Sequence, residues 1–262
     1  MTLPIYTVDA FAEQIFSGNP AAVSPLESWL EDDLLQNIAA ENNLSETVFI
    51  VKQEELYEIR WFTPLAEVDL CGHATLAAAH VLFNHLNYVG DQLLFKSRHS
   101  GILEVTKRDT TLTLNFPVDH LSAALTPDNL FEGLGKTPIE IWKGKTDYLL
   151  CYSSQRDIEL LRPDFGILKN IEARGIIVTA PGSECDFVSR FFAPCVGVNE
   201  DPVTGSAHTS LVPFWAARLG KSRFKARQLS SRGGTLECEL INDRVLISGK
   251  AHTYLIGTIN IT

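Results

Sequence analysis

The sequence predicts an α+β fold of two pseudo-symmetric lobes, each a rolled, mostly antiparallel sheet around one buried helix. Three observations predict it: motifs that recur about half a chain length apart, short segments of alternating apolar residues, and two helix-length segments that are apolar nearly all round. We expect the lobes to span residues 1–118 and 119–262, with an approximate boundary. The extreme C-terminal strand can cross back to the first lobe.

Internal repetition is the strongest evidence for two lobes. The pentapeptide RWFTP at residues 60–64 is echoed by RFFAP at residues 190–194. Each is followed by an acidic stretch and by a glycine that opens an apolar segment. Farther along, GILEV at residues 101–105 matches GTLEC at residues 234–238, at nearly the same offset. A period this long does not suit a solenoid, so two lobes of one plan fit better.

Strand signals dominate within each lobe. Residues 57–61, 103–106 and 111–116 alternate apolar and polar side chains. This period of two is expected of strands with one buried face. The short spacings between the segments favour antiparallel pairing, because parallel strands need long crossover connections.

Three segments are typical of helices. Residues 74–83 and 207–219 are apolar nearly all round, as helices buried on every side would be. Pro213 lacks an amide donor, so we expect it to kink the second of these helices or to mark a late start. Residues 31–41 have a polar face and should form a helix on the outside of the first lobe.

Composition and charge exclude several classes of protein. The net charge is −10, which argues against a nucleic-acid binder, because such proteins need a basic face. No apolar run reaches the ~18 residues of a membrane span, and the first residues lack the pattern of a signal peptide. The five cysteines are odd in number and scattered, which favours reduced thiols and a cytoplasmic location. We expect neither nucleic-acid nor membrane partners.

The beginnings of the two buried helices are candidate anion sites. Gly72 and Gly205 lie there, where the first backbone amides have no partner within the helix and the dipole adds partial positive charge. Glycine lets a ligand approach the backbone closely. For one such end, ordinary capping by Ser206 or Asp201 would be the simpler interpretation. Because the feature is duplicated, we favour a small ligand with a carboxylate, bound between the lobes.

Ionisable side chains gather near these ends. Glu46 begins an apolar strand, where a buried carboxylate can transfer protons, although a surface charge at the strand edge is the competing interpretation. His73 and His80 lie two helical turns apart, farther than the i, i+4 spacing of a chelating pair. Adding Cys71 does not complete a tetrahedral set. We therefore expect no metal and no other cofactor.

Four segments carry a resemblance to a known family. They are residues 8–21, with the motif Gly-Asn-Pro, and residues 45–49, 60–75 and 190–208. In order and spacing they resemble the phenazine-biosynthesis PhzF-type isomerase family. The resemblance covers essentially the whole chain. It implies a diaminopimelate-epimerase-like fold, with the active site in the cleft between two lobes.

The resemblance also implies roles for particular residues. Glu46 falls where the family has its acid/base glutamate, and His73 and Asp201 where it has polar groups that assist proton transfer and orient the substrate. The loops that bind a substrate carboxylate, and an N-terminal loop that lines the cleft, correspond here to Gly72, Gly205, Ser206 and Asn19. Related racemases use one cysteine from each lobe, and this sequence departs from them because Cys71 is matched by Thr204.

These inferences lead to one expected function and two alternatives. We expect a cofactor-independent isomerase in which Glu46 moves a proton within a small carboxylate-bearing metabolite. The first alternative is a non-catalytic small-molecule-binding protein of the same fold. The second is an amino-acid epimerase in which Cys71 assists. The resemblance further implies a homodimer, and the apolar residues 254–256 are suited to covering an exposed strand edge.

Overall fold

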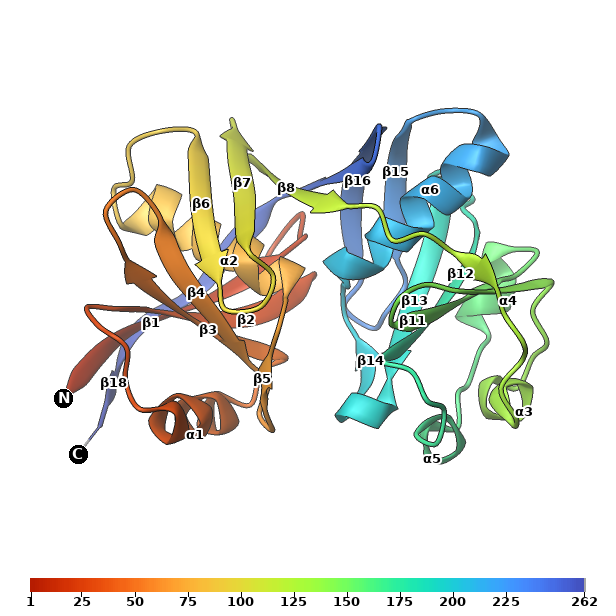
Figure 1. Cartoon of the computed structure of the whole chain (residues 1–262), viewed down its shortest axis with the longest axis horizontal. Helices are drawn as coiled ribbons and strands as arrows, with labels where there is room; N and C mark the ends of the chain where they lie inside the picture. The colour runs from red at the N-terminus through yellow and green to blue at the C-terminus, as the bar shows by residue number, and fades with distance from the viewer. Residues whose placement is uncertain (262) are drawn as a thin grey trace. The chain divides into compact units, whose positions relative to one another are not determined.

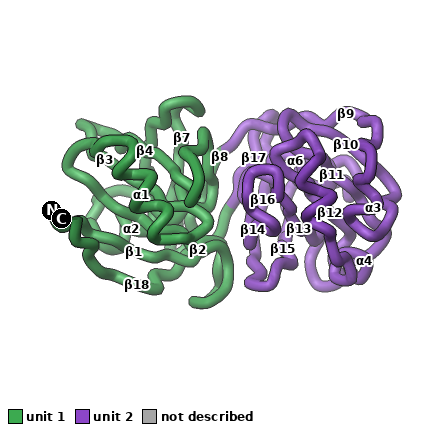
Figure 2. Tube along the Cα trace, turned by 90° about the horizontal axis from the view of Figure 1, so that it is seen from below, with its two compact units in different colours: residues 1–115, 248–262 green, residues 116–247 purple. Residues whose placement is uncertain are grey.

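The computed structural model describes residues 1–261, which form two compact units (Figures 1 and 2). Residues 1–115 and 248–262 make the first unit, and residues 116–247 make the second. The division falls slightly before the boundary expected from the sequence. The chain returns to the first unit through its last strand, β18 (Ala251–Asn260), which pairs antiparallel with the first strand, β1 (Thr2–Ala10).

The sheet of the first unit is largely antiparallel. Strands β1–β2, β3–β4, β6–β7 and β7–β8 pair antiparallel, whereas β2–β3 and β4–β6 pair in parallel. The helices are α1 (Asp32–Asn42) and α2 (Gly72–His85). The remaining strands are β2 (Asn19–Leu26), β3 (Glu46–Lys52), β4 (Tyr57–Phe62), β5 (Glu67–Val68), β6 (Gln92–Ser97), β7 (Ile102–Arg108) and β8 (Thr111–Pro117).

The second unit repeats this plan. Its parallel pairs, β11–β12 and β13–β15, stand where β2–β3 and β4–β6 stand in the first unit. Its strands are β9 (Ser122–Ala123), β10 (Glu140–Lys143), β11 (Asp147–Cys151), β12 (Gly175–Pro181), β13 (Phe187–Ala193), β14 (Val198–Asp201), β15 (Arg223–Gln228), β16 (Gly234–Ile241) and β17 (Arg244–Gly249). Its helices are α3 (Leu130–Leu134), α4 (Gln155–Glu159), α5 (Phe165–Leu168) and α6 (His208–Leu219), with short 3-10 turns η1 (Pro194–Val196) and η2 (Gly205–Ala207).

Helix α2 is the buried centre of the first unit. It contacts β1, β2, β3 and β18, and its residues from Gly72 to Phe83 are buried except for His80. Its three consecutive alanines, residues 77–79, are fully buried. Their small side chains let the surrounding strands come close to the helix axis. Helix α1 covers the other face of the same sheet through Leu35 and Ile38, so strands such as β3 are buried on both faces.

Helix α6 differs from its prediction in two ways. It begins at His208, directly after η2, and Pro213 lies inside it, so of the two effects expected of Pro213, a kink or a late start, the late start does not occur. Its first two turns are buried, but its end from Ala217 to Leu219 is exposed, so it is not buried on every side. The apolar composition of this segment therefore overstated its burial.

The repeated motif marks the same side-chain arrangement in both units. Arg60 Nε and Nη2 donate to the two carboxylate oxygens of Glu67 at 2.7 and 2.6 Å. Arg190 donates to Glu200 in the same way, at 2.7 and 2.9 Å. In each unit the guanidinium also stacks 4.9 Å from the ring of the phenylalanine two residues later. The echo in the sequence thus reflects one arginine–glutamate clamp that occurs twice, on β4 and on β13.

Two further features bear on the sequence predictions. All five cysteines are free thiols. Among residues 1–261, no helix is both long and apolar enough to cross a membrane.

Candidate active site

Three ionisable side chains meet in the first unit, at the start of β3 and the start of α2. His73 lies between the other two: its Nε2 is 2.9 Å from Oε2 of Glu46, and its Nδ1 is 3.4 Å from Sγ of Cys71. The side chain of Glu46 is only 15% exposed and that of His73 only 4%. Glu46 is therefore not a surface charge at the strand edge, because its carboxylate faces a buried imidazole.

The side chains of His73 and Glu46 lie close together, yet each has a buried polar atom that could still bond to a ligand. Nε2 and Oε2 lie 2.9 Å apart, the distance of an ion pair when the imidazole is protonated. Neither atom has a hydrogen-bond partner among residues 1–261, and both are shielded from solvent. Buried polar atoms are nearly always satisfied in folded proteins. Two adjacent buried atoms without hydrogen-bond partners are expected at a site that binds a polar ligand, before the ligand is bound.

Burial and neighbouring charge control the protonation of Cys71 and His73. Burial raises the pKa of Cys71 to about 11, and the Glu46 carboxylate acts in the same direction, so the thiol keeps its proton near neutral pH. Burial lowers the pKa of His73, but Cys71 and Glu46 outweigh it and the net direction is upward. Because Cys71 is a neutral thiol near pH 7, it carries no charge that could raise the pKa of His73 at that pH. The upward shift in the pKa of His73 near pH 7 therefore comes from Glu46.

Asn19 contacts this group from the first position of β2. Its side chain is completely buried, and its Nδ2 lies 3.1 Å from Nδ1 of His73. The sequence prediction placed Asn19 on a loop lining the site. The contact with His73 joins residues 54 positions apart, so no local motif could have indicated it.

The three donor types also deserve comparison with a metal site. Donor atoms of Glu46, Cys71 and His73 lie within 4.8 Å of one another, and divalent metals use such sets. However, His73 offers a different ring nitrogen to each neighbour. An ion on either nitrogen would therefore lie beside one of the other two donors rather than between them. The arrangement suits proton transfer better than convergence on one ion.

The helix beginning that carries His73 is open to an anion. Gly72 is the first residue of α2, and within the described part of the chain no side chain caps the helix. The capping interpretation weighed for the sequence therefore has no side-chain contact behind it at this end. The first amides and the helix dipole remain suited to a carboxylate.

The remaining predicted site residues form a second group, in the second unit. No side-chain hydrogen bond caps η2 either, within the described residues. The carboxylate of Asp201 accepts a hydrogen bond from the Thr204 hydroxyl. Gln228 fixes both residues: its Oε1 accepts from the Thr204 amide at 2.8 Å, and its Nε2 donates to the Asp201 carbonyl at 2.7 Å. The group is thus built around a strand end, η2 and the start of α6.

Arg174 is a component of this second group that the sequence did not indicate. Its Nη1 donates to the Ser206 hydroxyl oxygen at 3.1 Å, and its Nε and Nη2 donate to the buried carboxylate of Asp147. Since Ser206 accepts from Arg174, its own hydroxyl proton can point toward a ligand. The residue had no signal in the sequence, because an isolated arginine 32 positions away belongs to no motif.

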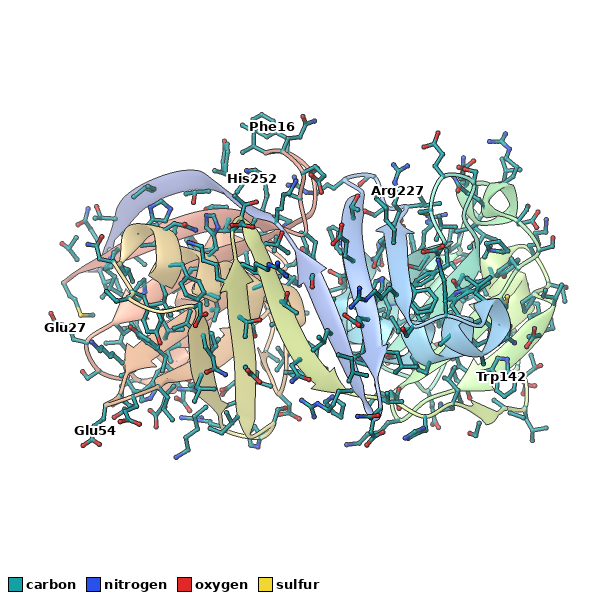
Figure 3. The ribbon with its side chains drawn as sticks, turned by 90° about the horizontal axis from the view of Figure 1, so that it is seen from above. Phe16, Glu27, Glu54, Trp142, Arg227 and His252 are labelled. Atoms are coloured by element: carbon teal, nitrogen blue, oxygen red, sulfur yellow. The ribbon has the colours of Figure 1, made fainter. Side chains whose placement is uncertain are left out.

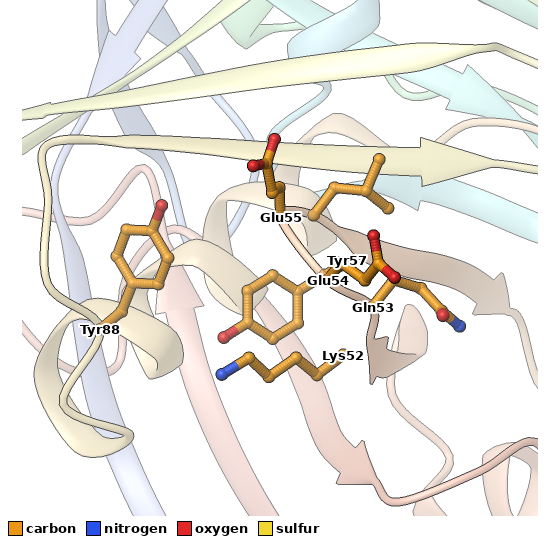
Figure 4. Close-up of a pocket in the computed structure, with 7 residues that line it drawn as sticks. Lys52, Gln53, Glu54, Glu55, Tyr57 and Tyr88 are labelled. Atoms are coloured by element: carbon orange, nitrogen blue, oxygen red, sulfur yellow. The ribbon is translucent and has the colours of Figure 1, made fainter.

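A separate hollow lies at the other end of β3. It measures about 310 Å³ and lies at the β3–β4 hairpin, as Figure 4 shows. Its lining consists of Lys52, Gln53, Glu54, Glu55, Leu56, Tyr57 and Tyr88. The charged residues among them are exposed: Lys52 ends β3, and Glu54 and Glu55 belong to the hairpin loop. Glu46 begins β3 and Lys52 ends it, so this hollow is not part of the candidate active site.

Known proteins share both the sequence and the fold. A family model described as phenazine biosynthesis-like protein matches residues 8–257. A Pseudomonas aeruginosa protein named as an uncharacterized isomerase is 52% identical, with 100% of both chains covered. Phenazine biosynthesis-like domain-containing protein 1 of Mus musculus is 41% identical, with 99% of both covered. A PhzF family crystal structure from Enterococcus faecalis matches with a TM-score of 0.95 at 45% identity, over 100% of both chains.

A more distant neighbour extends the comparison of the fold. A hydroxyproline epimerase from Agrobacterium vitis matches with a TM-score of 0.64 at 11% identity, over 98% of this chain and 92% of that one. At that identity the match shows the fold alone. The two-unit architecture is thus the diaminopimelate-epimerase-like fold, as predicted. Within that class, the chain belongs to the phenazine biosynthesis-like (PhzC–PhzF) family, and the resemblance inferred from the sequence is confirmed.

Proposed function

We propose that the protein is a cofactor-independent isomerase that moves a proton within a small carboxylate-bearing metabolite. The observation that carries the proposal is the buried pair of Glu46 and His73, whose facing polar atoms lack hydrogen-bond partners among the described residues. A relative that is 52% identical carries the name isomerase, which supports the same reaction class. A metal-independent proton transfer needs only such a pair and a means of holding the substrate.

The reaction would proceed by a proton shuttle on Glu46. Its carboxylate takes a proton from a substrate carbon, so the C–H bond breaks, an O–H bond forms and the electron pair stays on the substrate. The proton then returns to another atom of the same molecule. The amides at the start of α2 would hold the substrate carboxylate, and His73 would donate a hydrogen bond to charge that develops beside Glu46.

Residues of the second unit complete the proposal. We assign Gly205 and Ser206 to binding of the same substrate and Asp201 to its orientation. The support is chemical: an uncapped helical turn, a hydroxyl that already accepts a hydrogen bond from Arg174, and a carboxylate held by Thr204. These are the groups that an anionic, hydroxylated or aminated substrate would need.

Amino-acid epimerisation assisted by Cys71 is the second candidate. It is favoured by the contact of the thiol with His73 at 3.4 Å. It is disfavoured by the high pKa of the thiol, about 11, because a racemase needs a thiolate as its base. The matching position, Thr204, also lacks a thiol.

The decisive experiment is proton exchange with solvent. Purified protein is incubated in deuterium oxide with an extract of small carboxylates, and mass spectrometry identifies metabolites that gain deuterium or change retention time. With that metabolite as substrate, Glu46→Gln should reduce turnover on the order of 10²–10⁴-fold. Glutamine keeps the volume and an acceptor oxygen, so ligand affinity measured by calorimetry should persist.

Other outcomes would redirect the assignment. Wild-type turnover by Glu46→Gln would exclude the glutamate shuttle. Loss of activity in Cys71→Ser, with exchange at the α-carbon of an amino acid, would favour the epimerase. Tight binding of a metabolite without any deuterium uptake would favour a non-catalytic binding protein.

A further inference from the structure

The imidazole of His73 is approached on its Nδ1 side by a group that can only donate. Nδ2 of Asn19 lies 3.1 Å from Nδ1, and an amide nitrogen carries hydrogens but no free lone pair. A hydrogen bond at this distance therefore requires a lone pair on Nδ1. A proton on Nδ1 would instead place two donors face to face in a buried site, where Asn19 is 0% exposed and His73 3%.

From this contact we infer that Asn19 is a positioning residue: whenever the His73 imidazole is neutral, Asn19 holds it as the tautomer whose single proton is on Nε2. The second neighbour of Nδ1 is compatible with this state. The Cys71 thiol, 3.4 Å away, keeps its proton and can donate it weakly to a lone pair on Nδ1. The proton on Nε2 is then on the side of the ring that faces Glu46.

The fixed tautomer divides the chemical roles between two adjacent groups. His73 presents a hydrogen at Nε2, so it acts as a donor there and cannot take a proton from a substrate carbon at that atom. Glu46 is left as the one base of the pair. This step rests on the proposed function, in which Glu46 carries the proton and His73 stabilises developing charge. A histidine in the wrong tautomer can cost as much as ~10⁴ in rate when the geometry is otherwise intact.

The inference can be tested without a substrate, by nitrogen NMR of the full-length protein. Histidine labelled with ¹⁵N distinguishes a bare ring nitrogen from a protonated one, and His73→Gln identifies the signals of His73. Because Glu46 raises the pKa of His73, the spectra are recorded at alkaline pH, where the imidazole is neutral; in the wild type Nδ1 should then be bare and Nε2 protonated. Asn19→Asp has the same shape but accepts hydrogen bonds only, so Nδ1 of His73 should become protonated in it.

Two matched variants separate Asn19 from its surroundings. Cys71→Ala removes the other neighbour of Nδ1 and should leave the wild-type pattern unchanged. Asn19→Leu keeps most of the side-chain volume without hydrogen bonds, so the two tautomers should both become populated. A Cys71→Ala variant in which the proton moves to Nδ1 would overturn the inference, because the thiol rather than Asn19 would then set the tautomer.

The result does not depend on whether the isomerase assignment is correct. A neutral wild-type His73 with its single proton on Nδ1 would overturn the inference even in an active isomerase. The predicted NMR pattern in a protein without exchange activity would uphold it while the proposed function failed. With a substrate in hand, Asn19→Asp should lower turnover on the order of 10²-fold and change the pH profile, whereas Asn19→Leu should lower it less.

Discussion

Burial decides what single residues of this chain can do. Glu46 and Glu239 are both glutamates near strand ends, yet Glu239 pairs with the exposed Arg223 while Glu46 faces a buried imidazole. The sequence could indicate Glu46 and His73 because each lies in a segment shared with a known family. It could not indicate that Asn19 reaches His73, since that contact depends on β2 and α2 packing together.

The buried histidines predict how stability depends on pH. Burial lowers the pKa of His208 to about 4, and burial followed by the charges of His85, His252 and Lys107 does the same for His80. Both groups are therefore neutral in the folded protein, whereas the unfolded chain takes up protons near pH 6.5. Their contribution is complete above that pH and is lost as the pH falls toward 4. His73, whose pKa is raised, contributes in the opposite sense.

For His208, which is 0% exposed, the loss by about pH 4 should be on the order of 3 kcal/mol. Urea unfolding at about pH 7 and about pH 4.5 measures it. His208→Gln removes the titrating group, so the decrease between the two pH values should be smaller than in the wild type. An equal decrease in both proteins would assign the acid sensitivity to other groups.

The arginine clamp makes a second prediction for single residues. The Arg60 side chain is 2% exposed and bonds both Glu67 and Asp32. Lysine keeps the charge but not the planar fork, so Arg60→Lys should destabilise the first unit by at least about 2 kcal/mol. Arg223→Lys is the control, because that arginine is 80% exposed and its pair with Glu239 should contribute less than about 1 kcal/mol. Similar losses in both variants would contradict the argument.

At the scale of elements, the periodicity of apolar residues predicted whether a segment is a helix or a strand better than it predicted how buried that segment is. Strand β4 was expected over residues 57–61 and spans Tyr57–Phe62, and the outer helix was expected over 31–41 and spans Asp32–Asn42. The end of α6 is exposed despite its apolar composition, since nothing local reports which neighbours a segment will have. The parallel pairs β2–β3 and β11–β12 were not predicted, because helices or long loops connect them and the strands alone carry no sign of direction.

A shared hydroxyl ties α2 to the last strand and gives a prediction for these elements. Oγ1 of Thr253 on β18 lies 2.9 Å from Nε2 of His80 and 2.7 Å from Nε2 of His85. Thr253→Val keeps the shape and removes both hydrogen bonds, so it should cost about 1–3 kcal/mol in urea unfolding. Thr258→Val on the exposed part of the same strand is the control and should change stability by less than about 0.5 kcal/mol. Equal losses of stability in the two variants would mean that any valine substitution on β18 destabilises the protein, rather than the loss of the Thr253 hydroxyl.

At the scale of the whole molecule, the duplication explains why so much was predictable. Because both units have the same arrangement of elements, each element can be recognised in two places in the sequence. The arginine clamps show that the similarity of the two units extends to side-chain contacts. What lay beyond prediction is the pairing of distant residues that no motif joins, such as Arg174 with Ser206. The common action of the two groups of site residues on one substrate stays a prediction, carried by the proposed function.

The apolar surface of the last strand predicts how whole molecules associate. Strand β18 pairs with β1, and a bulge leaves three consecutive side chains exposed, Tyr254, Leu255 and Ile256, at 56%, 42% and 61%. Phe16, 67% exposed and standing out from the surface in Figure 3, packs edge-on against Tyr254 at 5.7 Å. Long, apolar, exposed strands are ready to pair with another chain, and soluble proteins usually cover them.

We therefore expect a homodimer that covers this strand, with a mass in light scattering of twice 29.0 kDa. Ile256→Lys places a charge in the contact and should yield the monomer mass, with little effect on folding because the side chain is largely exposed. Val89→Lys is the control, since Val89 is 93% exposed in a loop and should leave the dimer intact. A wild-type mass of 29.0 kDa over a wide range of concentrations would refute the dimer. A dimer that survives Ile256→Lys would move the interface away from β18.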